Sequence, residues 1–313
     1  MSQQVTPEPV PEPQGPAAPD SMKKHQKKSS FVRWMKLLLK SKTGTVGFLI
    51  VMVVFIVGIF SDQIAPFGVN EQNYANMLVP PAWQEGGSSE HFLGTDNLGR
   101  DILSRIIYGT TISLLVGIFS VVVAGILGMA AGLFAGYYGG WIDTVTMRMV
   151  DAFLSIPNIL FILVILTVLN PGIMTLIFAI GVTNWVIYAR LIRGEVLSVK
   201  EREYVKAARS IGTKNLTIIR RHVLPNVFST FIVISTLSVA TTIILEASLS
   251  FLGMGVQPPD VSWGYMLADG RDYLATNWWL ATFPGLAITI TVLGIIFLGD
   301  WLRDVLDPRS QGR

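Results

Sequence analysis

The chain has 313 residues, of which 51% are hydrophobic and only 14% are charged, and its mean hydropathy is +0.52. This composition is typical of a protein embedded in a bilayer and excludes an ordinary soluble domain. The formal net charge of +3 gives no case for nucleic-acid binding, and the lack of any cysteine excludes disulfides, thiolate metal sites and a cysteine nucleophile.

The N-terminal region has two parts of different composition. Residues 1–22 are rich in Pro, Glu, Gln and Ala, which predicts a disordered tail. Residues 23–42 carry eight Lys or Arg and no acidic residue, directly before an uncharged run, and such a basic flank indicates the cytoplasmic side of a membrane. We expect a transmembrane domain over 43–308 and a short C-terminal tail at 309–313.

Hydrophobic stretches along the chain predict an all-α membrane protein with six transmembrane helices. A bilayer core about 30 Å thick requires about 20 helical residues. The stretches that reach or approach this length are 44–60, 110–136, 152–169, 172–189, 227–245 and 279–299.

The connections between these stretches differ in their basic residues. There are nine Lys or Arg in 190–226, but only two in 61–109 and one in 246–278. The positive-inside rule therefore predicts that both termini and 190–226 are cytoplasmic, and that 61–109 and 246–278 are external.

Three local patterns precede the fourth span. In the external loop, Asp96, Arg100 and Asp101 predict either turn bonding with a surface ion pair or a contact with a docking partner. Pro157 predicts a kink in the third span. Small residues every four positions favour close helix packing in the second span, at Gly128, Gly132 and Gly136.

The charged segment 198–226 predicts two short packed helices. Ser198 and Glu201 have the spacing of a capping box, which predicts a helix start at Ser198. Gly212 suits a left-handed cap, and Pro225 is expected to end a second helix. One apolar stripe is expected from Tyr204, Val205, Ala207, Ala208 and Ile211.

What this segment contacts is open from periodicity alone. Two small alanines would let a partner backbone approach closely, which favours a segment that inserts into a groove of a partner protein. A basic amphipathic loop that rests on lipid headgroups fits the same pattern.

The sequence contains no signature of an enzyme or of a metal site. No nucleotide-binding loop of the G-x-x-x-x-G-K-[ST] type occurs, and the three histidines lack ligand spacing. Ionisable residues fall only at the ends of the spans, as with Asp151, Glu246 and Asp300, which disfavours ion coupling. An ion-driven secondary transporter and a passive membrane scaffold remain as alternatives.

Two further expectations concern the aromatic residues and the solute path. The aromatic side chains of 246–279, which include Trp263 and Trp279, are expected at the membrane interface, with ligand contacts as the alternative. A solute passage, if there is one, is expected to be mostly uncharged and lined by Ser, Thr and Asn184.

Three segments in this order resemble the permease subunits of ABC importers of the dipeptide/oligopeptide and nickel family, specifically the second, C-type permease. They read FLGTDNLGRDILSRIIYG at 92–109, EYVKAARSIGTKNLTIIRRHVLPN at 203–226 and SFLGMGVQPPDVSWGYMLADGR at 250–271. The resemblance covers about residues 40–308. Lys206 departs from it, because an acidic residue commonly precedes the two alanines.

The resemblance implies a complex in the cytoplasmic membrane of a prokaryote. Its partners would be a homologous permease, two ATP-binding subunits that hold ATP and Mg, and an extracytoplasmic solute-binding protein that Asp96, Arg100 and Asp101 could contact. This chain would bind no cofactor and catalyse no reaction. Nickel complexes or other small solutes are alternatives to peptides. The contact with the ATPase would be made by Glu203, Ala207, Ala208, Gly212, Leu224 and Pro225.

Overall fold

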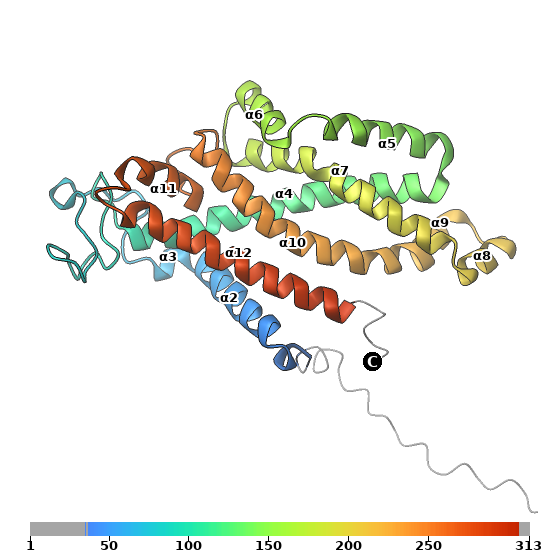
Figure 1. Ribbon diagram of the computed structural model, residues 1–313, viewed down its shortest axis with the longest axis horizontal. Helices are drawn as coiled ribbons and strands as arrows, with labels where there is room; N and C mark the ends of the chain where they lie inside the picture. The colour runs from blue at the N-terminus through green and yellow to red at the C-terminus, as the bar shows by residue number, and fades with distance from the viewer. Residues whose placement is uncertain (1–34, 36, 307–313) are drawn as a thin grey trace, which may run out of the picture.

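The computed structural model describes residue 35 and residues 37–306, and Figure 1 shows it as an elongated bundle of helices. The predictions for 1–22 and 309–313 lie outside the described residues, as does most of the basic segment. Within the described part, helices and one isolated bridge between Thr95 and Asp101 are the regular secondary structure, and the longest segment without an α-helix is 65–101.

Five helical stretches are long and apolar enough to cross a membrane, and a sixth span would require one bent pair of helices. Each of the five covers a predicted hydrophobic stretch to within one residue at its ends. In four of them the helix extends at least seven residues beyond that stretch. The five helices are α2 (Lys42–Ile59), α4 (Ile102–Tyr138), α7 (Ile173–Lys200), α10 (Leu224–Phe251) and α12 (Trp279–Leu306).

The predicted third span, 152–169, is not one helix. The chain forms α5 (Gly140–Leu154) and α6 (Asn158–Leu169), which meet at an angle of 87°. Pro157 lacks a backbone donor and pushes the residue before it out of helical geometry, so the break falls where the kink is predicted. At 1.5 Å per residue, α6 is only about 18 Å long, which is too short to cross a bilayer core alone.

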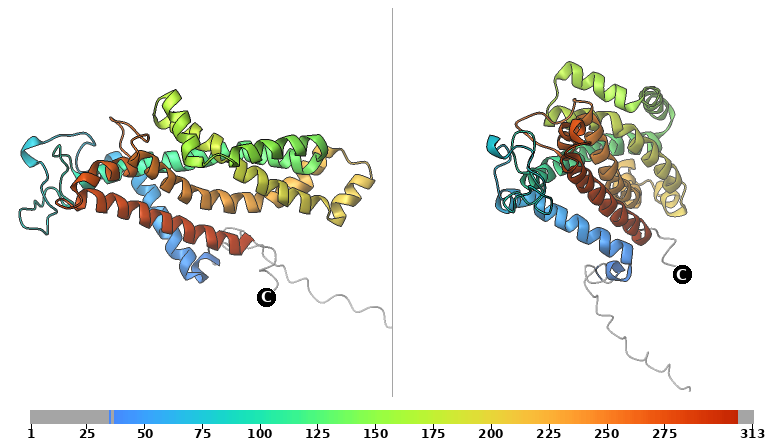
Figure 2. Two further views of the ribbon diagram at one scale, coloured as in Figure 1. Left: turned by 45° about the horizontal axis from the view of Figure 1, so that its top comes forward. Right: turned by 60° about the vertical axis from the view of Figure 1, so that its left-hand side comes forward.

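The pair α4 and α7 forms the centre of the bundle, as the predicted glycine pattern requires. A Cβ atom added at Gly132 would lie 2.5 Å from the Ala189 carbonyl oxygen, and one at Gly136 would lie 2.8 Å from the Cβ of Val196. Only a glycine lets the two backbones approach this closely. Around this pair, α10 packs on α4 and α12, and α2 packs on α12 (Figure 2).

Short elements cap the two ends of the bundle. One end carries the loop that follows α3 (Ser61–Ile64), with η1 (Tyr74–Asn76), together with α11 (Trp263–Gly270) and η3 (Arg271–Tyr273). The opposite end carries α8 (Glu203–Ser210), α9 (Asn215–Ile218) and the π-helical turn η2 (Ile219–Val223), as Figure 1 shows.

Trp263 and Trp279 do not form a lipid-facing aromatic belt as predicted, because both side chains are buried inside the protein. The indole of Trp263 donates to the Ile106 carbonyl at 3.0 Å, and that of Trp279 donates to the Thr95 carbonyl at 3.2 Å. Trp263 joins α11 to the first turns of α4, and Trp279 joins the start of α12 to the loop before α4, so their apolar surface stabilises this end of the bundle.

Candidate functional site

The segment between α7 and α10, residues 201–223, forms a projection that we call the α8 hairpin. It lies at the opposite end of the molecule from the loop of residues 66–101 (Figure 1). The two long helices α7 and α10 lead directly into it, so it is attached to the bundle through continuous helix on both sides.

The hairpin does not start as predicted. Ser198 lies inside the last turn of α7, and the break follows Lys200, so the expected capping box does not form. Arg202 is the N-cap of α8 and makes no side-chain cap hydrogen bond. Instead Glu201 pairs with Lys206 at 3.0 Å, and this ammonium holds the pKa of the Glu201 carboxyl below its usual value.

The predicted apolar stripe of α8 is divided between two surfaces. Val205 and Ala208 are buried against the bundle, where they pack with side chains at the ends of α7 and of η2. Tyr204 and Ile211 are 43% and 83% exposed, and Ala207 is exposed as well. At 100° per residue these three side chains occupy one flank of the helix, which leaves an apolar strip facing outward.

Two turn residues of the hairpin differ in outcome. Gly212 has a φ of +79°, as predicted, and the Thr213 amide donates to the Ala208 carbonyl at 3.1 Å. Pro225 does not end a helix, because it lies in the first turn of α10, where a missing amide proton costs nothing. The π-turn η2 precedes it and joins α9 to α10 without a break.

Polar contacts fix the hairpin to the bundle. The Tyr137 hydroxyl of α4 donates to Asn215 Oδ1 at 3.0 Å, and the Arg209 guanidinium lies 5.7 Å from the Tyr137 ring centre. Arg202 donates to Asn226 Oδ1 at 3.1 Å. The hairpin is thus held by α4, α7 and α10 together. Of the predicted contact residues, Glu203, Ala207, Gly212 and Pro225 are exposed, Leu224 is partly buried and Ala208 is buried.

At the other end, the predicted surface ion pair of the 92–109 loop is in fact buried. Asp96 is 1% exposed and accepts hydrogen bonds from Arg100 Nε at 2.6 Å and from Arg105. Asp269 of α11 adds a second carboxylate, 3.3 Å from Arg100. This network joins the loop, α4 and α11, so its two guanidinium groups stabilise the cap from within.

Asp101 has a similar structural role. Its carboxylate is the N-cap of α4, where it accepts the Ser104 amide and hydroxyl, each at 2.7 Å. His91 Nδ1 lies 3.1 Å from the other oxygen of the carboxylate. The contact of Asp96, Arg100 and Asp101 with a solute-binding protein stays a prediction, and the burial of these three residues leaves a partner almost no surface to reach.

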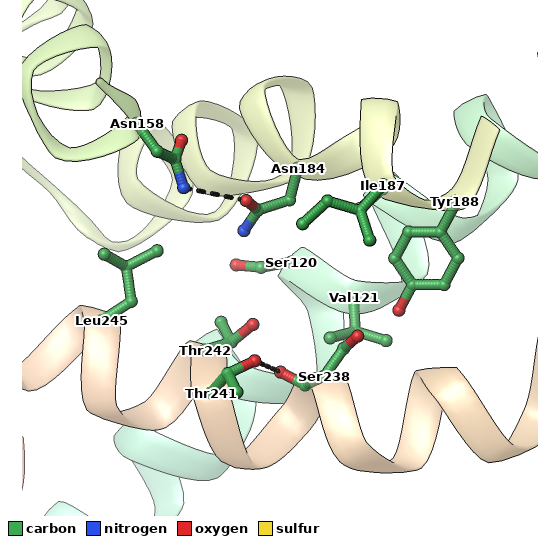
Figure 3. Close-up of a pocket in the computed structure, with 11 residues that line it drawn as sticks. Ser120, Val121, Asn158, Asn184, Ile187, Tyr188, Ser238, Thr241, Thr242 and Leu245 are labelled. Carbon is green, nitrogen blue, oxygen red and sulfur yellow. Dashed lines mark hydrogen bonds between the residues drawn. The ribbon is translucent and has the colours of Figure 1, made fainter. Parts of the chain in front are cut away.

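A cavity of about 330 Å³ lies between α4, α6, α7 and α10, and we call it the interhelical cavity (Figure 3). Its floor is buried and its rim is exposed, with the amide of Asn158 donating to Asn184 Oδ1 at 3.0 Å. Asn184 was expected from the sequence to line a passage. The other polar lining residues were not singled out by number, although all of them lie within predicted hydrophobic stretches: Ser120, Asn158, Tyr188, Ser238, Thr241 and Thr242.

Long apolar helices, a cavity among them and a helical hairpin at one end are the features of a multi-pass membrane protein with room for a small solute. Comparison with known proteins gives its family. Residues 128–312 match the model of the binding-protein-dependent transport system inner membrane component, and residues 29–81 match the N-terminal TM domain of oligopeptide transport permease C.

Several relatives cover almost the whole chain. A dipeptide transport system permease of Alkalihalophilus pseudofirmus is 40% identical over 302 residues, which is 96% of this chain and 96% of the relative. A glutathione transport system permease of Pectobacterium atrosepticum is 40% identical over 278 residues, or 89% and 90% of the two chains. The chain belongs to the binding-protein-dependent transport system inner membrane component family, and it is a permease subunit of an ABC importer in the bacterial inner membrane.

A solved structure supports the fold. The MetNI methionine ABC transporter, in an inward-facing conformation, has a chain that matches with a TM-score of 0.55 and 19% sequence identity. The match covers 66% of this chain and 98% of that chain.

Proposed function

We propose that this chain is a translocation subunit for di- and oligopeptides, and that it couples solute passage to ATP hydrolysis in separate subunits. The complex would hold a homologous second permease, two ATP-binding subunits carrying ATP and Mg²⁺, and an extracytoplasmic solute-binding protein. The names of the relatives support the peptide class. Under this proposal the α8 hairpin and both termini are cytoplasmic.

The outward apolar strip of α8 is the observation that carries the coupling role. Tyr204, Ala207 and Ile211 are contiguous on α8, outside the predicted spans, and a contiguous exposed apolar patch marks an interaction site. The strip lies on a short helix that α4, α7 and α10 hold firmly, so a protein that grips it can move these long helices as units. A hairpin that rests on lipid would carry its basic side chains toward the headgroups without requiring a socket.

A charge placed on the strip tests the proposal. In the complete complex, Ala207→Glu is expected to reduce ATP-dependent dipeptide uptake at least tenfold, because an unpaired carboxylate would have to be desolvated in the ATPase groove. Membrane insertion should be unchanged. Uptake of a labelled dipeptide and co-purification of the ATPase subunits are the two measurements.

The matched control places the same charge on an exposed position of α8 that is not one of the three residues of the strip. Ser210→Glu is expected to retain most uptake, since Ser210 lies near the outermost line of the helix, next to the basic side chain of Lys206. A wild-type rate of dipeptide uptake in Ala207→Glu would contradict the role of the strip. So would an equal loss of uptake in the two variants.

A further inference from the structure

The floor of the interhelical cavity carries hydroxyl groups whose bonding is incomplete. The Ser120 hydroxyl of α4 is 1% exposed and has no hydrogen-bond partner within the described residues. The buried Tyr188 hydroxyl of α7 lies close to the hydroxyls of Ser235 and Ser238 of α10, but it makes no hydrogen bond of suitable geometry within the described residues. Buried hydroxyls are almost always bonded, and a serine within a helix commonly bonds its own backbone. Two such groups beside one cavity therefore indicate that a guest or water completes their bonding.

The rim of the cavity carries two amide side chains. Asn158 begins α6 immediately after the 87° bend, and its amide donates to Asn184 of α7. The second amide group, that of Asn184, is directed toward the cavity and Ser120, as Figure 3 shows. An amide side chain has donors and an acceptor in the same arrangement as a peptide unit.

The lining of the cavity is uncharged. Among its eleven residues there is no Asp, Glu, Lys, Arg or His. A charged lining would select solutes by the charge of their side chains, whereas hydroxyl and amide groups bond the backbone N–H and C=O that all peptides share. The volume of about 330 Å³ lies in the range of small-molecule sites.

We propose that the interhelical cavity is a subsite of the translocation path that holds an uncharged peptide unit of the passing solute, through the hydroxyls of Ser120 and Tyr188 and the amide of Asn184. This inference rests on the proposed function, because it requires that a peptide pass through this subunit. It adds the place where the peptide backbone is bonded and the reason that one path serves peptides of different charge.

A thiol at the cavity floor tests whether solute reaches it. Since the chain has no cysteine, Ser120→Cys introduces its single thiol. In membrane vesicles that hold the complete complex, a small charged methanethiosulfonate is expected to label this chain, as read by mass. Excess alanyl-alanine with ATP should slow the labelling about fivefold or more, since a bound solute excludes the reagent.

Ser113→Cys is the matched control. Ser113 lies on the same helix, seven residues or about two turns away and on the same face, but its hydroxyl accepts the Trp263 amide at 3.2 Å inside the packed core. No labelling of this variant is expected. Equal labelling of both variants, or labelling of Ser120→Cys that the dipeptide does not slow, would overturn the subsite.

A carboxylate at the rim of the cavity tests whether the uncharged lining is the reason that peptides of different charge can pass. The same experiment distinguishes a failure of the subsite from a failure of the proposed function. With Asn184→Asp, uptake of glutamyl-alanine is expected to fall about fivefold relative to that of lysyl-alanine, each measured against the wild type. An unchanged ratio would refute the subsite while the transport role stands. A wild-type complex that takes up neither peptide with ATP present would instead refute the proposed function.

Discussion

At the scale of single residues, one carboxylate organises the end of the molecule opposite the α8 hairpin. Asp96 accepts the backbone amides of Leu98 and Arg100 at 2.8 and 2.9 Å, besides the two guanidinium groups. A buried ion pair gives modest net stability, but removal of one partner leaves the other charged and desolvated. Loss of Asp96 would leave two buried arginines with Asp269 alone.

We therefore expect Asp96→Asn to destabilise the subunit by about 3 kcal/mol or more. The measurement is the thermal unfolding of the purified complex, followed by tryptophan fluorescence. The control is Asp272→Asn at the same end, where an exposed pair with Arg271 at 3.2 Å should contribute less than about 1 kcal/mol. If both variants unfold at the wild-type temperature, the ion-pair network around Asp96 does not stabilise the subunit.

At the scale of elements, the contact of α4 with α7 determines the position of the cavity and of the hairpin. Three glycines of α4 bring the two backbones together, and Lys200 at the end of α7 donates to the Gly136 carbonyl at 2.9 Å. Because lipid offers little hydrophobic driving force between helices, close backbone packing is the main attraction here. A side chain in this contact would separate the helices.

Two glycine-to-alanine substitutions test this packing, because they are expected to change the stability of the subunit in opposite directions. Gly132→Ala is expected to destabilise the subunit by about 1 to 3 kcal/mol, because the nearest atoms include backbone of α7 that cannot move aside. At the exposed position Gly194 of α7, an added Cβ would have nothing within 4 Å, so Gly194→Ala should stabilise by up to about 1 kcal/mol through helix propensity. Unfolding in detergent measures both, and an equal response would exclude the close contact as the cause.

At the scale of the whole molecule, the cavity and the hairpin share the same helices. Asn184 and Tyr188 lie on α7, whose last residue is Lys200, three positions before α8. Ser238 lies on α10, which continues from η2. A displacement of the hairpin would therefore move two walls of the cavity, and such a rigid linkage is a physical basis for coupling.

This arrangement predicts the energy source. Uptake by the complete complex is expected to continue when the proton gradient is collapsed while ATP is held constant, and to stop when ATP is removed. Labelled dipeptide uptake in energised vesicles measures this. Uptake that follows the gradient would favour a secondary transporter, and uptake that survives deletion of this chain would favour a passive scaffold.

Hydrophobic length and glycine pattern predicted the five spans that are single helices, out of six expected, together with the α4 packing face, the turn at Gly212 and a kink at Pro157, because each depends on neighbours a few residues apart. The same local reasoning failed for Ser198, since α7 packs on α4 up to its last turn and the helix continues through the expected cap. It also failed for Trp263, because the number of aromatic residues in a segment does not show whether a given side chain faces lipid or is buried in the protein. Burial by a distant segment is invisible to a local pattern.

The sequence by itself determined that this is a multi-span α-helical protein with a glycine-turned hairpin between its fourth and fifth hydrophobic stretches. Only the tertiary structure decided which side of α8 is free, that the pair of Asp96 and Arg100 is internal, and that Ser120, Asn158, Asn184 and Tyr188 meet at one cavity. The reason is physical: hydrophobicity and turn geometry act over a few residues, whereas a site is made by helices whose packing brings residues 120, 188 and 238 together.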